Sequence, residues 1–211
     1  MLDFILDFLF PKKCVGCGEE GSYFCEKCCN EIDFCQPVLV RMKAGPLEGV
    51  VAAGKYQGTL KEAIHIFKYE KVKDLADSLS EILAKVLRNK NIDFLQEYSF
   101  IPVPLFSKKE KERGFNQSEL LGERLAEKSK IKLSLDVLLK SKDTPAQMGL
   151  KKKVREKNLF GAFTIKDRRE VRGKNIVLLD DVMTTGATLY ECAKVLRRAG
   201  AKKVFGLILA R

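Results

Sequence analysis

Residues 176–188 constrain the fold of this chain more than any other stretch, because they read as a short strand, a turn and the start of a helix. Residues 176–179 are four consecutive apolar residues, a run typical of a buried strand. Two carboxylates, Asp180 and Asp181, follow directly, at the strand end where open α/β sheets place their ligands. The pattern predicts an α/β sheet with a binding site at this edge.

The loop after the carboxylates is suited to a phosphate. It offers small residues, hydroxyls and accessible backbone N–H groups at a predicted helix start, where the amides and the helix dipole favour an anion. These loop residues are Thr184, Thr185, Gly186, Ala187 and Thr188. The two carboxylates can accept hydrogen bonds from ribose hydroxyls while the loop holds the 5′-phosphate. The segment resembles the 5-phosphoribosyl-1-pyrophosphate (PRPP) motif of type I phosphoribosyltransferases; an ordinary strand-turn-helix with an acidic turn is the alternative.

Six of the seven cysteines lie within residues 14–35. They include two Cys-x2-Cys pairs separated by seven residues, and tetrahedral zinc takes four thiolates from two such turns. The expected ligands are Cys14, Cys17, Cys25 and Cys28. Cys29 and Cys35 are spare, and either can replace Cys28. A disulfide framework is the alternative, which the lack of a secretion signal disfavours. We therefore predict a structural zinc-binding module within residues 1–44.

The first ten residues are apolar but do not read as a signal peptide. They lack a basic segment and a small-residue cleavage site, and they contain Asp3 and Asp7. Ten residues are also too few to span a membrane. Because the leucines and the isoleucine fall on one helical face, we expect a short packing helix, with docking to a membrane surface as the alternative. The sequence predicts a cytoplasmic protein with no transmembrane segment.

Residues 45–211 alternate predicted strands with predicted helices. The strands are expected at 50–56, 100–105, 136–139, 160–165, 176–179 and 204–209, and the helices at 59–69, 74–87, from 116 onward and from 188 to 199. Prolines and glycines within 37–49 indicate a linker out of the cysteine module. Strands that alternate with helices indicate a mostly parallel sheet with flanking helices.

Two further segments of this domain carry functional expectations. Residues 108–113 read as a basic loop ahead of a helix capped by Asn116, which makes a second anion site suited to a pyrophosphate leaving group. A basic loop exposed to solvent is the alternative. Residues 143–158 form a long polar and basic loop, and loops of this length in compact domains usually serve function. We interpret it as a mobile cover over the active site.

The charge of the chain is unevenly distributed. The formal net charge is +11, yet residues 1–44 are slightly acidic, so the rest of the chain carries +13. Residues 105–174 hold most of that excess. This excess of positive charge predicts a polyanionic partner, which is a pyrophosphate-bearing substrate, nucleic acid, or both. For any single run of basic residues, the alternative is a solvent-exposed surface that keeps the protein in solution. The cysteine module is slightly acidic, which disfavours a DNA-binding zinc finger, because contacts to DNA phosphates need Lys and Arg.

The chain as a whole resembles the ComF family, the group that includes ComFC and GntX. The matching segments are Phe10-Pro11, the cysteine pairs, 56–58, 67–69, Val103-Pro104, 113–117, 144–147, Asn158, 161–163, the PRPP motif and 209–211. The resemblance implies a zinc-binding module on a type I phosphoribosyltransferase-like domain and a link to DNA uptake in natural competence. Family members often carry more paired cysteines after the second knuckle. Only Cys29 and Cys35 follow here, so we expect no second zinc site.

The leading hypothesis is Mg2+-dependent use of PRPP by a phosphoribosyltransferase, a glycosyltransferase whose acceptor the sequence does not identify. Asp180 and Asp181 would hold the ribose hydroxyls, residues 184–188 the 5′-phosphate, and Arg113 with Lys68 the pyrophosphate. One alternative is a single-stranded DNA-binding protein without catalysis that acts with a competence helicase or uptake channel. Another is a regulator that senses PRPP without chemistry. The sequence indicates no oligomeric state.

Overall fold

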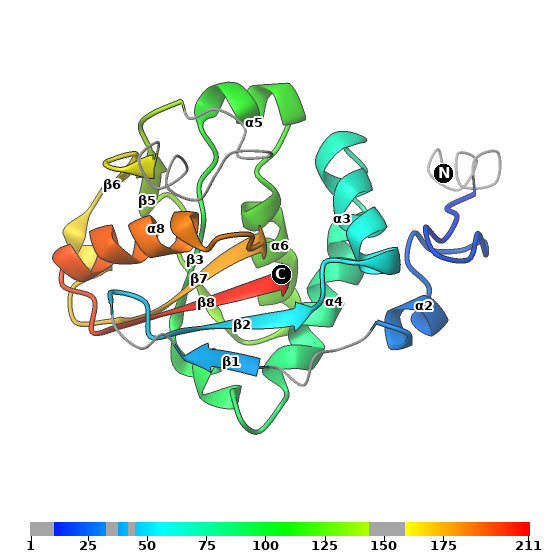
Figure 1. Ribbon diagram of the computed structural model, residues 1–211, viewed down its shortest axis with the longest axis horizontal. Coiled ribbons are helices and arrows are strands. Elements are labelled where there is room, and N and C mark those ends of the chain that lie inside the picture. The colour runs from blue at the N-terminus through cyan, green and yellow to red at the C-terminus, as the bar shows by residue number, and fades with distance from the viewer. Residues whose placement is uncertain (1–10, 33–37, 42–44, 144–158) are drawn as a thin grey trace.

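A central β-sheet organises the protein, which the computed structural model describes at residues 11–32, 38–41, 45–143 and 159–211. Its strands are β1 (Val38–Arg41), β2 (Gly49–Gly54), β3 (Ser99–Pro102), β4 (Lys132–Leu133), β7 (Asn175–Val182) and β8 (Lys203–Ala210). The spatial order is β1-β2-β8-β7-β3-β4. Figure 1 labels all of these strands except β4. All neighbours are parallel except β1, which is antiparallel to β2. The mostly parallel α/β sheet predicted from the sequence is confirmed.

Helices and a small hairpin cover the two faces of the sheet (Figure 1). The helices are α2 (Glu26–Asn30), α3 (Gly58–Tyr69), α4 (Leu75–Leu87), α5 (Ser107–Arg113), α6 (Gln117–Lys128) and α8 (Ala187–Arg198), and two 3-10 turns span Asp93–Glu97 and Arg168–Glu170. The hairpin pairs β5 (Leu138–Lys140) with β6 (Phe163–Ile165). Side chains of α3, α4 and α6 belong to one buried cluster, and those of α8 and the hairpin to another.

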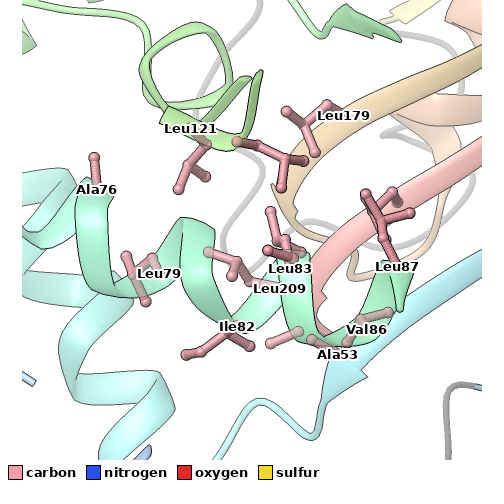
Figure 2. Close-up of a cluster of buried hydrophobic side chains, with 14 of the residues drawn as sticks. Ala53, Ala76, Leu79, Ile82, Leu83, Val86, Leu87, Leu121, Leu179 and Leu209 are labelled. Atoms are coloured by element: carbon pink, nitrogen blue, oxygen red, sulfur yellow. The ribbon is translucent and has the colours of Figure 1, made fainter. Parts of the chain in front are cut away.

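Side chains of β8 point alternately to the two faces of the sheet, so this one strand contributes to both buried clusters. Leu207 and Leu209 pack with α4 and α6, whereas Val204 and Ile208 pack with α8. Every residue of β8 after Lys203 is buried, which is why the sequence reads there as a nearly continuous apolar run. Figure 2 shows the first cluster, with Leu83 of α4 between the sheet and α6. Buried side chains therefore pack against both faces of the sheet.

Several sequence expectations are corrected by the fold. The expected linker 37–49 contains β1, an edge strand of only four residues. Residues 108–113, expected as a basic loop, belong to α5, since straight-chain Lys, Glu and Arg are good helix formers. Gly114 ends that helix at φ 83°, a left-handed conformation that glycine adopts readily. The helix expected at 59–69 begins one residue earlier, at Gly58, and ends at Tyr69 as α3.

Other expectations fall outside the described residues. These are the N-terminal packing helix within 1–10, the segment 144–158 of the expected cover, and Cys35. The boundary between residues 44 and 45 stays a prediction. Of the helices that the structure describes, none has the length and apolar character needed to cross a membrane.

Candidate functional site

The carboxyl ends of the parallel strands gather polar residues at one edge of the sheet. β7 continues through Val182, so Asp181 is its second-to-last residue and Asp180 its third-to-last. Because they are adjacent in a strand, their side chains leave opposite faces. Asp181 points to the side of α3 and reaches Lys68, the penultimate residue of that helix. Asp180 accepts a hydrogen bond from Ser118 of α6. The acidic pair thus links three elements that are distant in sequence.

Asp181 and Lys68 form a buried ion pair. The Nζ–Oδ1 distance is 2.8 Å, and the side chains of Lys68 and Asp181 are only 17% and 8% exposed. Burial alone would lower the pKa of Lys68, but the charges of Asp181 and Asp180 outweigh it and the pKa is raised. The lysine therefore stays charged at neutral pH. Removing one partner of such a pair leaves a buried charge uncompensated, which typically costs about 3–5 kcal/mol.

Asp180 has a different environment from its neighbour. Its Oδ1 accepts from Ser118 Oγ and from the backbone N–H of Asp181, each at 2.9 Å. Burial, and then the adjacent charge of Asp181, raise the pKa of Asp180 from its ordinary value of 3.8 to about 7. Lys68 and the two hydrogen bonds oppose this shift without cancelling it. At neutral pH the carboxyl group therefore exchanges readily between its charged and neutral forms.

The loop between β7 and α8 forms a cavity beside Asp180. The cavity has a volume of about 40 Å³, and it is lined by Asp180 and residues 182–189. Gly186 adopts φ 77° directly before α8, and the backbone N–H of Ala187 donates to Thr185 Oγ1 at 3.4 Å. The first N–H groups of a helix have no partner within the helix, so this end of α8 favours an anion. All five predicted phosphate-loop residues line this cavity together with Asp180.

Arg113 lies on the other side of the acidic pair, at the end of α5. Its Nη1 donates to Gln117 Oε1 at 2.8 Å, and its guanidinium carbon lies 5.5 Å from the ring centre of Tyr69. Arg113 is also close enough to Lys68 for its charge to act against the raised pKa of that lysine. The structure therefore brings Arg113 and Lys68 to the same side of the site.

Ser118 and Gln117 are site residues to which the sequence analysis assigned no role. The segment 113–117 stood out as a matching motif, so Gln117 lay within a recognised signal. No sequence signal pointed to Ser118, because the residue that it contacts, Asp180, lies 62 positions away in the chain. Only the packing of α6 against β7 brings these two residues together.

The cysteine pairs form a second candidate site, away from the sheet edge. The sulfur atoms of Cys14, Cys17, Cys25 and Cys28 all lie within 4.8 Å of one another. In the described parts of the chain, no other group of His, Cys, Asp or Glu side chains offers such a cluster. Cys29 is turned away and receives a contact from Lys85 Nζ at 3.8 Å. The four predicted cysteines can together hold a metal ion.

Backbone amides favour the thiolate form of Cys14, one of the four cysteines. Cys14 Sγ accepts from the N–H groups of Gly16 at 3.4 Å and Cys25 at 3.3 Å. Burial would raise the pKa of Cys14, but these and neighbouring hydrogen bonds outweigh it and lower the pKa to about 6. A Cβ atom at Gly16 would lie 2.7 Å from both Cys28 Sγ and Thr59 Cγ2. The cluster is therefore packed directly against the first turn of α3.

Comparisons with known proteins agree with this arrangement. The phosphoribosyl transferase domain family matches residues 116–210. Competence protein F of Haemophilus influenzae is 31% identical over 202 residues, 94% of this chain and 84% of that protein. DNA utilization protein YhgH of Escherichia coli K12 is 32% identical over 164 residues, 77% of this chain and 71% of that protein.

Two further proteins are similar over shorter parts of their length. Competence protein ComFC of Bacillus subtilis is 32% identical over 152 residues, 69% of this chain and 56% of that protein. Among solved structures, the B. subtilis glutamine PRPP amidotransferase complexed with ADP and GMP overlaps 63% of this chain and 25% of its own, with 22% identity and a TM-score of 0.42.

The raised pKa of Asp180 predicts a specific pH dependence of stability. Between pH 4 and 7 the unfolded chain has released this proton while the folded chain retains it, so the free energy of unfolding falls as the pH rises. Asp180→Asn cannot titrate, and we expect its stability to fall less over that range. Urea unfolding at several pH values measures the difference. The exposed Asp136→Asn is the matched control, and equal slopes for wild type and Asp180→Asn would contradict the environment described for Asp180.

Proposed function

We propose a function from the premise that this chain belongs to the ComF family of competence-related proteins with a phosphoribosyltransferase-like domain. The chain binds PRPP with Mg2+ at the carboxyl edge of the sheet and transfers its phosphoribosyl group to an acceptor. The observation that carries this proposal is the acidic pair beside the α8 N-terminus. One side of Asp180 offers an anion-binding loop, and the other offers two cationic side chains.

The proposed roles follow from this layout. The 5′-phosphate binds residues 184–188, at the N-terminus of α8, where the helix dipole favours an anion. Asp180 and Asp181 accept hydrogen bonds from the ribose hydroxyls. The pyrophosphate lies toward Lys68 and Arg113, whose charges stabilise it as it departs. Catalysis then rests on positioning and on electrostatic stabilisation of a cationic ribose and an anionic leaving group.

The site is compatible with Mg2+. That ion prefers oxygen ligands and is commonly held by one or two carboxylates together with substrate phosphates, and two carboxylates stand at this edge. When bound with PRPP, Mg2+ would neutralise part of the pyrophosphate charge. The segment 143–158 keeps its proposed role as a cover that excludes water, and the acceptor is left open.

Asp181→Asn tests the PRPP site. The amide cannot pair with Lys68 or accept in the same way from a ribose hydroxyl, so we expect the affinity for Mg2+·PRPP to fall about 10-fold or more. Isothermal titration calorimetry measures it, with Asp136→Asn as the control and circular dichroism to show that each variant is folded. Unchanged binding would overturn the assignment. Saturable binding without pyrophosphate release on any acceptor would favour a PRPP-sensing regulator over an enzyme.

The four-cysteine cluster is proposed to hold one structural Zn2+. Four sulfur donors from two short turns match the ligand set that zinc prefers, and such ions contribute directly to folding. Its place against the first turn of α3 means that the ion would stabilise the helix that carries Lys68.

Cysteine substitutions separate the ligands from the spare residues. We expect one zinc per chain in the wild type and in Cys29→Ala, and strongly weakened zinc binding in Cys25→Ser, because three ligands hold the ion less well than four. Metal analysis and competition with a chromogenic chelator measure both. Loss of zinc in Cys29→Ala with retention in Cys28→Ala would instead make Cys29 the fourth ligand.

A second candidate function is the binding of single-stranded DNA in concert with uptake machinery. Its support is a group of exposed basic residues at the amino edge of the sheet, opposite the proposed PRPP site. The group consists of Arg168, Arg172, Arg198, Lys202 and Lys203. Backbone hydrogen bonds from Gly173 to Gly200 and from Lys202 to Lys174 join the two segments that carry it. Such a group of basic residues can bind the phosphates of DNA, which gives affinity that does not depend on the base sequence.

Charge neutralisation tests this second function. Fluorescence anisotropy of a labelled oligonucleotide should show binding that weakens from 50 to 200 mM salt, as counterion release requires. The double variant Arg198→Gln/Lys202→Gln should bind more weakly and with a shallower salt slope. Neutralising Lys151–Lys153, which lie outside the described residues, gives a parallel measurement for the predicted loop. No binding by the wild type at 50 mM salt would end this proposal.

A further inference from the structure

Gln117 is a buried polar residue whose amide lacks an acceptor. It is the first residue of α6 and only 1% exposed. In the parts of the chain that the structure describes, its Nε2 is the one buried side-chain nitrogen or oxygen with no hydrogen-bond partner. Burying an unpaired polar group destabilises a fold, so such groups are rare unless something else satisfies them.

The orientation of this amide follows from its neighbour. Arg113 Nη1 donates to Gln117 Oε1 at 2.8 Å, and a guanidinium has donors only. Exchanging the amide oxygen and nitrogen would place two donors against each other, so the hydrogen-bond network determines the orientation. Nε2 is therefore directed away from Arg113 with both N–H groups unused.

The surroundings of Gln117 contain an excess of donors and positive charge. Arg113 and Lys68 lie close together on this side of the acidic pair, and Asp181 neutralises only one of them. Asn116 caps α6 by accepting from the N–H of Ser118 at 3.1 Å, which leaves the positive end of a twelve-residue helix at the same place. An acceptor-rich anion is the ligand that this group of residues fits.

We propose that Gln117 is a binding residue for the pyrophosphate group of PRPP, to which its Nε2 donates a hydrogen bond beside the Arg113 guanidinium. The proposal rests on the PRPP site proposed above and extends it, because it assigns recognition of the leaving group to a neutral amide as well as to the two cations. Arg113 has two functions in this arrangement. It holds the amide through Oε1 and presents its remaining N–H groups to the same anion.

Gln117→Glu tests this directly. A carboxylate has nearly the same shape and can still accept from Arg113, but it has no N–H to donate and adds a negative charge. We expect affinity for Mg2+·PRPP and for Mg2+·pyrophosphate to fall about 10-fold or more, since hydrogen bonds to charged groups are strong. Binding of ribose 5-phosphate, which lacks the pyrophosphate, should change less than about twofold. Gln96→Glu is the control, because that amide bonds to Leu87 O on another part of the chain.

The outcomes separate this proposal from the one on which it rests. Equal weakening of all three ligands would make Gln117 a structural residue and overturn the proposal. Wild-type binding of PRPP with no change in Gln117→Glu would also overturn it, while the PRPP site would stand. If the wild type binds no PRPP, the proposed function fails, and with it the assignment of Gln117 to PRPP. Gln117→Met serves if the glutamate variant does not fold, since it removes the donor without adding charge and should weaken the same two ligands.

Discussion

The buried ion pair between Lys68 and Asp181 is the contact on which the arrangement of the site depends. It joins the end of α3 to the end of β7 in a place where both side chains are largely buried, so each charge requires the other. With Asp181 held in this way, its charge and the surrounding burial keep Asp180 partly protonated near neutral pH. The carboxyl ends of the strands therefore present one ion-paired and one partly protonated carboxyl group side by side.

Helix α3 connects the two candidate sites of the molecule. Its first turn contacts the cysteine cluster through Thr59 and Gly16, and its last turn carries Lys68 and Tyr69. A further ion pair, Lys12 with Asp74 at 2.8 Å, joins the cysteine module to the start of α4. The module and Lys68 therefore lie at opposite ends of the same helix. The module is thus packed as part of the fold that supports the acidic pair.

Sequence patterns predicted the elements with strong local signals. The strand at the acidic pair, the helices over 59–69 and 74–87, and the Asn116 cap correspond to β7, α3, α4 and the start of α6. Short edge strands were missed, because β1 and β4 have four and two residues and gain their stability from neighbouring strands. Helix α5 was read as a basic loop, because its seven residues include no buried side chain and so carry no apolar periodicity.

The sequence by itself determined the kinds of chemistry available: two thiol pairs at metal-binding spacing, two adjacent carboxylates, and a loop of small and hydroxyl residues at a helix start. These depend on short-range spacing, which the chain carries wherever it folds. Tertiary structure alone decided which distant groups meet those residues. Lys68 and Asp181 are separated by 113 positions, and Ser118 and Asp180 by 62. Only the parallel sheet, which brings the carboxyl ends of its strands to one edge, places them together, and only the packing of α6 leaves the Gln117 amide without a partner.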